Sequence, residues 1–293
     1  MSITLEKTSS CKVNLILNIL GRRPDGYHEL ETVMQPVPLH DTLRFEKRAS
    51  PGIQITCSDP NLPADSSNLV YKAADRFLKT AGASDGIQIH LEKRLPMAAG
   101  LGGGSGNAGT TLLALNELFG QPLNAVQLHA IAAGIGSDVP FFLQDRPALA
   151  TGRGEIVEAL PRFAALEKTW ILLVHPGFGI STPWAYQQLA HHPDALKGRS
   201  GRARCLVDLL QSTDLSAAAG EFYNSLEAPA LFKFPLLALF QEFFREHGAA
   251  GTLMSGSGST TFAIVSGQSA AERLLEKFLG RFGRGYWTAT VAL

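Results

Sequence analysis

A glycine-rich segment, PMAAGLGGGSGNA at Pro96–Ala108, most constrains what this chain can fold into. Glycine fills five of the seven positions from 100 to 106, so the backbone there can take positive φ angles and approach a ligand closely. Apolar residues then recur at three-to-four spacing over 112–119, which predicts a helix whose first turn Ser105 or Asn107 could cap. Such a loop favours anions, because the unpaired N–H groups and the helix dipole attract negative charge.

Phosphate binding is one of two interpretations of this segment, since glycine-rich turns before helices are also common. The segment lacks the Gly-Lys-Ser/Thr ending of a P-loop, and Asn107 stands where a G-x-G-x-x-G motif needs its last glycine. A bound phosphate must therefore be neutralised by something other than a P-loop lysine. Lys93 and Arg94 are the nearest cations, although both could simply be solvated.

The composition limits the classes of protein to which the chain can belong. Its 293 residues, 45% of them hydrophobic, are long for one compact domain, so we expect two, at 1–159 and 160–293. The 26 basic residues balance 26 acidic ones without a long block of either sign, which argues against a nucleic-acid or membrane partner. The three cysteines are scattered and form no C-x-x-C pair, which argues against a disulfide framework or a thiolate zinc site. We expect a cytoplasmic protein.

The order of the predicted elements indicates an α+β protein, because hairpins and helices mix without regular βαβ alternation. Strands are expected at 12–20, 42–47, 52–57, 86–91, 170–174 and 286–293, with a strand, glycine turn and strand over 252–265. Helices are expected at 66–81, after the glycine loop, and at 125–133, 183–189, 217–223, 236–247 and 270–282. The basic, glycine-bearing stretch 199–204 is expected to be a mobile surface loop.

Three further motifs accompany the glycine loop. The chain reads Lys12-Val13-Asn14-Leu15 running to GRRPDGYHELETVMQ, then the loop, then GSDVPFF and finally MSGSGST. In order and spacing these motifs resemble the GHMP kinases over nearly the whole chain. The P-D-G-Y-H segment at Pro24–His28 separates it from the homoserine, mevalonate and galactose kinases of that family. The resemblance implies a two-domain α+β GHMP kinase fold, with a ribosomal-S5-like N-terminal domain and a ferredoxin-like C-terminal domain.

The resemblance also implies an activity and its small-molecule substrates. The chain would be an ATP-dependent kinase of the non-mevalonate isoprenoid pathway, acting on the 2-hydroxyl of a methylerythritol unit carried on cytidine diphosphate. We expect a monomer or weak homodimer. The residues implied to hold ATP are Asn68, Lys93, Pro96, Met97, Ala98, Ala99, Gly100, Leu101, Gly102, Gly103, Gly104, Ser105, Gly106 and Asn107. Asn68 and Asn107 could also be simple helix caps.

The catalytic candidates are Asp138 and Lys12. Phosphoryl transfer needs positioning, charge neutralisation and a group that receives the proton of the nucleophile. Taken alone, Asp138 could be that group or the cap of a helix starting at Val139-Pro140, and Lys12 could be a surface lysine on a strand. The resemblance implies a catalytic Asp138 paired with Lys12. Lys12 would keep the carboxylate ionised or stabilise the developing alkoxide, and these two roles stay open.

The substrate-binding candidates lie in the P-D-G-Y-H segment and further along the chain. Tyr27 and His28 offer a ring face and a ring nitrogen, although an exposed Tyr-His pair alone would more often be incidental. The resemblance implies that Tyr27, His28 and Tyr186 hold the cytosine and that Asn14 and Thr182 line the methylerythritol side. A second glycine element, 255–259, could be only a hairpin turn, and the resemblance puts it opposite the first loop.

No metal site made of protein ligands is expected. Several relatives carry a glutamate as magnesium ligand, and Gln127 stands near that position here, which is a poorer ligand for a hard cation. Magnesium would then be held mainly by ATP and water, with Ser105 as either a ligand or a simple cap.

Two other functions are compatible with parts of the sequence. A sister activity of the family, such as homoserine or mevalonate kinase, would share the ATP loop but lack the Tyr27-His28 pair. A binding module without catalysis would tolerate the loss of Lys12 or Asp138, and both are present.

Overall fold

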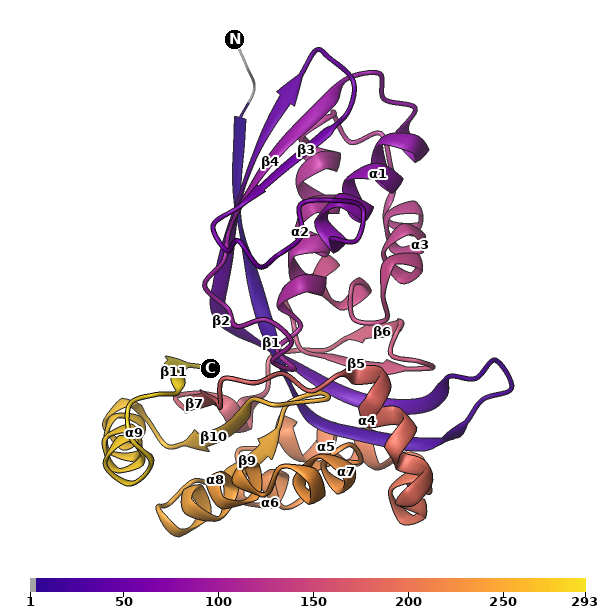
Figure 1. The fold of residues 1–293 in the computed structure, drawn as a ribbon. Coiled ribbons are helices and arrows are strands. Elements are labelled where there is room, and N and C mark those ends of the chain that lie inside the picture. The colour runs from indigo at the N-terminus through magenta and orange to yellow at the C-terminus, as the bar shows by residue number, and fades with distance from the viewer. Residues whose placement is uncertain (1–3) are drawn as a thin grey trace. The chain divides into compact units, whose positions relative to one another are not determined.

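The protein divides into two compact units, each assembled from separate stretches of chain (Figure 1). The structure is a computed structural model that describes residues 4–293. Unit 1 comprises the stretch ending at Cys11 together with Leu39–Leu95 and Gly102–Asp145, and unit 2 comprises Lys12–Pro38, Pro96–Leu101 and Arg146–Leu293. The domain limits expected from the sequence, 1–159 and 160–293, stay a prediction.

Unit 1 is a sheet with helices packed on it (Figure 1). Two long strands, β1 (Thr4–Arg22) and β2 (His28–Arg48), each contribute one part to unit 1 and the other to unit 2. The other elements of unit 1 are β3 (Ile53–Cys57), β4 (Gly86–Glu92), α1 (Leu69–Ala81), α2 (Gly103–Leu118), α3 (Ala125–Ile135) and the 3-10 helix η1 (Pro140–Leu143). Strand β4 pairs antiparallel with β2 and parallel with β3.

The alternation of apolar and polar residues along β4 explains how this strand contributes to the core of unit 1. Ile87, Ile89 and Leu91 alternate with polar residues and are fully buried, because every second side chain of a strand points to the same face. They belong to one cluster with Phe77 of α1 and Leu112 of α2. The helical stripe expected behind the glycine loop therefore anchors α2 in this core.

Unit 2 contains a second sheet and most of the helices (Figure 1). Its strands are β5 (Ala148–Thr151), β6 (Ile156–Ala159), β7 (Trp170–His175), β8 (Tyr223–Asn224), β9 (Gly251–Met254), β10 (Thr261–Val265) and β11 (Trp287–Ala292). Its helices are α4 (Thr182–Gln188), α5 (Arg202–Gln211), α6 (Leu215–Gly220), α7 (Glu227–Lys233), α8 (Pro235–Glu246) and α9 (Gln268–Phe282), with the 3-10 helices η2 (Ala164–Leu166), η3 (Leu189–His191) and η4 (Pro193–Leu196).

The strands of unit 2 form two groups. The order β11-β7-β10-β9 makes a four-stranded sheet in which every pair is antiparallel. Strand β8 instead pairs in parallel with β1, and β5 pairs with β2 and β6. A buried aromatic cluster with Phe240 and Phe278 joins α8 and α9 to β7 and β10. A second cluster packs α4 and α7 against Leu17 and Leu30 of the β1–β2 hairpin.

The α+β class expected from the sequence is confirmed, and most predicted elements are present. The stretch 199–204 is an exception, since α5 already begins at Arg202. The carboxylate of Glu31, on β2, accepts hydrogen bonds from Gly201 N and Ala203 N at 3.0 Å each and so caps the helix from a distant strand. Tyr223, expected at a helix end, instead pairs with Ile16. Over residues 4–293, the helices are all too short or too polar for a membrane crossing.

Candidate active site

The first turn of α2 begins behind a glycine. Gly102 is the N-cap residue, with φ of 70°, and it makes no side-chain cap hydrogen bond. Ser105 and Asn107 lie inside α2, so the expectation that either caps it was wrong. Because α2 starts three residues earlier than a Ser105 cap would require, its first turn consists of Gly103, Gly104 and Ser105, whose backbone N–H groups are of the kind that binds anions at a helix start.

Asp41 organises the surroundings of this turn. Its carboxylate, fully buried on β2, accepts hydrogen bonds from Arg94 N at 2.8 Å and Leu95 N at 3.0 Å. It also accepts one from Asn107 Nδ2 at 3.0 Å and forms an ion pair with Lys93. Two predicted ATP residues, Lys93 and Asn107, therefore meet at one carboxylate. Sequence reasoning missed Asp41, because a single aspartate between a strand's apolar residues has no recognisable motif.

Asp138 follows α3 in a turn that is anchored to α2. The neighbouring Phe142 packs so closely on α2 that a Cβ added to Gly109 would lie 2.8 Å from Phe142 Cβ. Val139, buried in the core of unit 1, is the N-cap residue of η1, which begins at Pro140. Asp138 thus stands one residue before the N-cap position, and both interpretations of its role stay predictions. Asp138 itself is partly exposed and lies in the same unit as the α2 turn.

Lys12 is buried in the middle of β1, with 2% of its surface exposed. Its ammonium donates hydrogen bonds to Asn14 Oδ1 at 2.6 Å and to Gly100 O at 3.1 Å. Asn14 in turn donates to Thr32 Oγ1 at 2.8 Å. The interpretation of Lys12 as an ordinary surface lysine was therefore wrong, because this side chain is inside unit 2 with its charge at the glycine loop.

The two glycine segments touch each other within unit 2. Ser255 donates through Oγ to Gly100 O at 2.9 Å, and Thr260 N donates to Ala99 O at 3.1 Å. Gly256 lies against one catalytic candidate, Lys12, since a Cβ added there would be 3.3 Å from Lys12 Nζ. The second segment is thus more than a hairpin turn: it packs against the part of the first loop that lies in unit 2.

The predicted methylerythritol residues lie beside this contact. Asn14 N donates to Ser255 Oγ at 3.4 Å. Thr182, the first residue of α4, shares a hydrogen bond of 2.8 Å with Ser257 through the two hydroxyl oxygens. The structure therefore brings Lys12, Asn14 and Thr182 to the second glycine segment.

Two of the predicted cytosine residues, His28 at the start of β2 and Tyr186 of α4, form an aromatic pair. The rings of His28 and Tyr186 are 5.1 Å apart at an angle of 34°. Burial, with a smaller contribution from the charge of Arg22, lowers the pKa of His28 below its usual value, so the ring is neutral at neutral pH. A neutral imidazole has one donor and one acceptor nitrogen, which suits the edge of a base.

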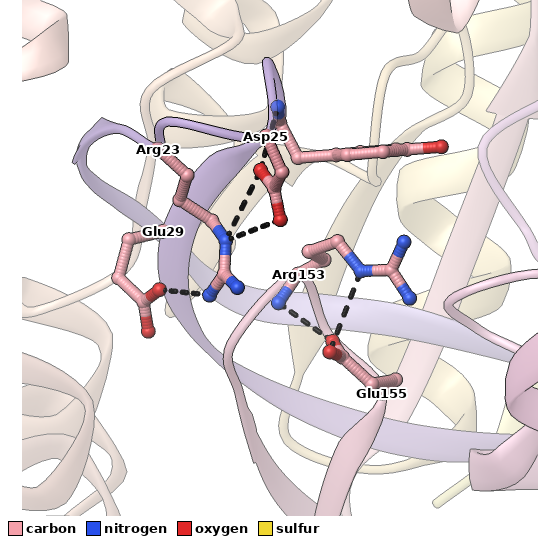
Figure 2. Close-up of polar contacts among 6 residues, drawn as sticks. Arg23, Asp25, Glu29, Arg153 and Glu155 are labelled. Carbon is pink, nitrogen blue, oxygen red and sulfur yellow. Dashed lines mark hydrogen bonds and ion pairs between the residues drawn. The ribbon is translucent and has the colours of Figure 1, made fainter.

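Tyr27 is 54% exposed and held in place by charged neighbours of the hairpin and of the β5–β6 turn. Its backbone N–H donates to Asp25 Oδ1 at 3.1 Å, and the Arg153 guanidinium lies 4.6 Å from the centre of its ring. Figure 2 shows Arg23 between Asp25 and Glu29, and Arg153 bonded to Glu155. Sequence reasoning missed Arg153, whose turn contacts the hairpin only in the folded protein.

Two residues of the prediction have local roles. Asn68 accepts a hydrogen bond from Val70 N at 2.9 Å and caps α1, as the simpler of its two interpretations expected. Gln127 forms a capping box with Asn124 at the start of α3. In the part of the chain that the structure describes, acidic, histidine and cysteine side chains form no group of three or more that could hold a metal ion.

Family models match both halves of the chain. The model described as the GHMP kinases N terminal domain matches residues 68–146, and that described as GHMP kinases C terminal matches residues 206–285. The first range contains the α2 turn and Asp138.

Individual proteins match over almost the whole length. A protein of Geobacter sp. (strain M21) named 4-diphosphocytidyl-2-C-methyl-D-erythritol kinase is 39% identical over 281 residues, 95% of this chain and 96% of the relative. A crystal structure of 4-(cytidine 5'-diphospho)-2C-methyl-D-erythritol kinase has a TM-score of 0.79 and 37% identity, covering 99% of this chain and 100% of the other. The homoserine kinase of Cytophaga hutchinsonii has a TM-score of 0.76 at 21% identity, covering 99% and 95%, and shows a shared fold alone.

Proposed function

The chain belongs to the GHMP kinase family, and on this basis we propose that it transfers the γ-phosphate of ATP to the 2-hydroxyl of 4-diphosphocytidyl-2-C-methyl-D-erythritol, in the non-mevalonate isoprenoid pathway. The observation that carries the choice of substrate is the aromatic pair of His28 and Tyr186, whose ring centres are 5.1 Å apart, with the exposed Tyr27 next to His28 in the chain. Homoserine and mevalonate contain no base for such a group to bind.

The nucleotide side of the reaction is assigned to the glycine loop and its neighbours. The phosphates of ATP accept hydrogen bonds from the backbone N–H groups of Gly103, Gly104 and Ser105, where the helix dipole adds positive potential. Lys93 and Asn107, fixed by Asp41, border this turn. Magnesium enters as part of the ATP substrate and is held mainly by phosphate oxygens and water, with the hydroxyl of Ser105 as a further ligand.

The second substrate is assigned to residues of unit 2. Its cytosine stacks on Tyr27 and Tyr186, and His28 binds the edge of the base. Asn14 and Thr182 bind the hydroxyl groups of the methylerythritol unit.

The chemical step is assigned to Asp138 and Lys12. As the bond from the substrate oxygen to the γ-phosphorus forms and the bond to the β–γ bridging oxygen breaks, Asp138 takes the proton of the 2-hydroxyl and ADP leaves. Lys12 supplies positive charge, and because it is buried that charge is weakly screened.

A substrate panel tests the proposal. Purified protein with magnesium and ATP is offered the diphosphocytidyl substrate, homoserine and mevalonate, and ADP release is measured while phosphorus NMR identifies the phosphate ester formed. Turnover confined to the diphosphocytidyl substrate, with a new ester at the 2-position, supports the proposal, and absence of that turnover refutes it. We further propose a cytoplasmic monomer or weak homodimer, which light scattering and fractionation test.

A further inference from the structure

The last residue of β8, Asn224, and the first residue of α7, Glu227, bind the backbone at and before the second glycine segment. Asn224 is 2% exposed, and its side-chain amide donates to Met254 O and to Gly256 O, both at 2.8 Å. Its oxygen accepts from Leu226 N at 2.9 Å. Both amide hydrogens and the amide oxygen are therefore engaged with backbone groups, which fixes the orientation of the side chain.

Glu227 binds the backbone N–H of the residue whose carbonyl Asn224 holds, Met254. Its carboxylate accepts a hydrogen bond from Met254 N at 2.7 Å, and Gln241 holds the same oxygen. Met254 is the last residue of β9, at the edge of the four-stranded sheet. Glu227 thus binds the N–H of Met254 and Asn224 binds its C=O, immediately before the glycine segment begins.

The serines of the glycine segment are held by their own side chains, Ser255 at Gly100 O, Ser257 at Thr182 and Ser259 at Phe178 O, whereas its two glycines have no side chain to hold them. Gly256 and Gly258 have φ of 55° and 87°, where glycine is favoured but anchors nothing. The opposite side of Gly256 faces the candidate site: a Cβ added there would lie 3.0 Å from Gly100 O and 3.3 Å from Lys12 Nζ. A shift of the Gly256 carbonyl therefore changes the surface on which Lys12 rests.

We propose that Asn224 is a positioning residue for phosphoryl transfer, whose side-chain amide holds the second glycine segment where Lys12 and Gly100 require it. The inference rests on the proposed function for its kinetic part. Asn224 contacts no reacting atom in this role and acts through Gly256. If Asn224 only covered the open edge of β9, replacing it would lower the stability of the protein but leave kcat of the folded protein unchanged.

Asn224→Ala and Asn116→Ala form a matched pair of variants. Asn116 likewise uses its side-chain amide on backbone, donating to Leu123 O and accepting from Leu123 N at 3.0 Å each, but it lies in unit 1, in the last turn of α2, and binds the connection from α2 to α3. Both variants lose stability, so kinetics are measured at a temperature where circular dichroism shows each to be folded. We expect Asn224→Ala to lower kcat at least about tenfold with both KM values within about threefold, because small misplacements of a catalytic group are costly. Asn116→Ala should keep kcat within about twofold, since it disturbs no group of the site.

Asn224→Asp supplies a pH readout that simple loss of packing would not give. An ionised carboxylate faces two carbonyl oxygens and repels them, whereas a protonated carboxyl can donate one hydrogen bond. The deficit in kcat relative to the wild type should therefore shrink as the pH is lowered through the titration of the new group. A deficit that is the same at every pH contradicts the hydrogen-bonding role.

Hydrogen exchange gives a readout that needs no substrate. In Asn224→Ala, backbone exchange should become faster in peptides covering 254–260 and 96–101, and Asn116→Ala should leave both unchanged. Unchanged exchange there in folded Asn224→Ala, or equal kcat losses in the two variants, overturns the inference. If the wild type fails on the diphosphocytidyl substrate, the proposed function is wrong, whereas the exchange result still decides whether Asn224 holds the segment.

Discussion

Replacing Gly100 by alanine is the sharpest test of how the two glycine segments are arranged. Gly100 has φ of +77°, and a Cβ added to it would lie 2.0 Å from Ser255 O and 3.1 Å from Gly258 N. Both are backbone atoms, so no side chain can turn away to make room. Contacts below 3.0 Å essentially never occur for a real Cβ, and the segments must therefore separate by at least about 1 Å.

The expected magnitude has two parts. A left-handed alanine costs about 1 to 2 kcal/mol, and forcing an extra carbon into a packed contact costs about 1 to 3 kcal/mol. Gly100→Ala should thus lower the free energy of unfolding by about 2 to 5 kcal/mol. The same shift breaks the hydrogen bonds that Gly100 O accepts from Lys12 and Ser255, so we expect kcat to fall about a hundredfold.

Gly120→Ala is the control that separates the backbone strain of a left-handed alanine from the effect of the packed contact. Gly120 has φ of +81°, and a Cβ added to it would meet no described atom within 4 Å. This control should therefore lose only the strain of about 1 to 2 kcal/mol and keep its kcat. Urea unfolding measures the free energies, and ADP release at saturating substrate measures kcat of folded protein. If the two alanine variants lose the same stability and the same activity, the contact between Gly100 and Ser255 does not govern the site and the reasoning is refuted.

Three further outcomes are expected. Asp138→Asn should lower kcat at least about a hundredfold while leaving ATP affinity by calorimetry unchanged, since it removes only the proton acceptor, and near-normal kcat would exclude that role. His28→Ala should raise KM for the cytidylyl substrate and spare KM for ATP, and equal rises in both would contradict the assignment of the base to His28 and Tyr186. Burial lowers the pKa of His175 below that of the unfolded chain, so its contribution to stability is complete above about pH 6.5 and is lost as the pH falls toward the folded pKa. The melting temperature should accordingly decrease as the pH is lowered from about 6.5, and it should decrease less in His175→Gln. His28, whose pKa burial also lowers, contributes in the same direction. An identical decrease in the wild type and in His175→Gln would rule out His175 as a source.

Features with a local cause were predicted from the sequence. The helix after the glycine loop, α2, has its apolar stripe buried as its spacing indicated, and β4 shows the expected alternation. The α+β class and the two-domain GHMP kinase fold are confirmed. The roles given to individual site residues stay predictions.

Features that depend on distant partners were missed. Asp41, Arg153 and Asn224 are single polar residues without a motif, and each is important only for what it contacts in the folded chain. The start of α5 was missed for the same reason, since its cap is Glu31 on β2 rather than a neighbouring residue. Strand β8, only Tyr223–Asn224, exists because β1 offers it a partner.

The sequence by itself determined which backbone can bend sharply, which faces are apolar, and the order of motifs that marks the family. Only the tertiary structure decided what surrounds the charged side chains. Lys12 reaches Gly100 across 88 residues and Asn14 meets Ser255 across 241. Propensity and periodicity act over a few residues, whereas a buried charge is tolerated only where folding brings hydrogen-bonding groups to it from anywhere in the chain. These contacts, rather than the local sequence, place the charge of Lys12 at the glycine loop.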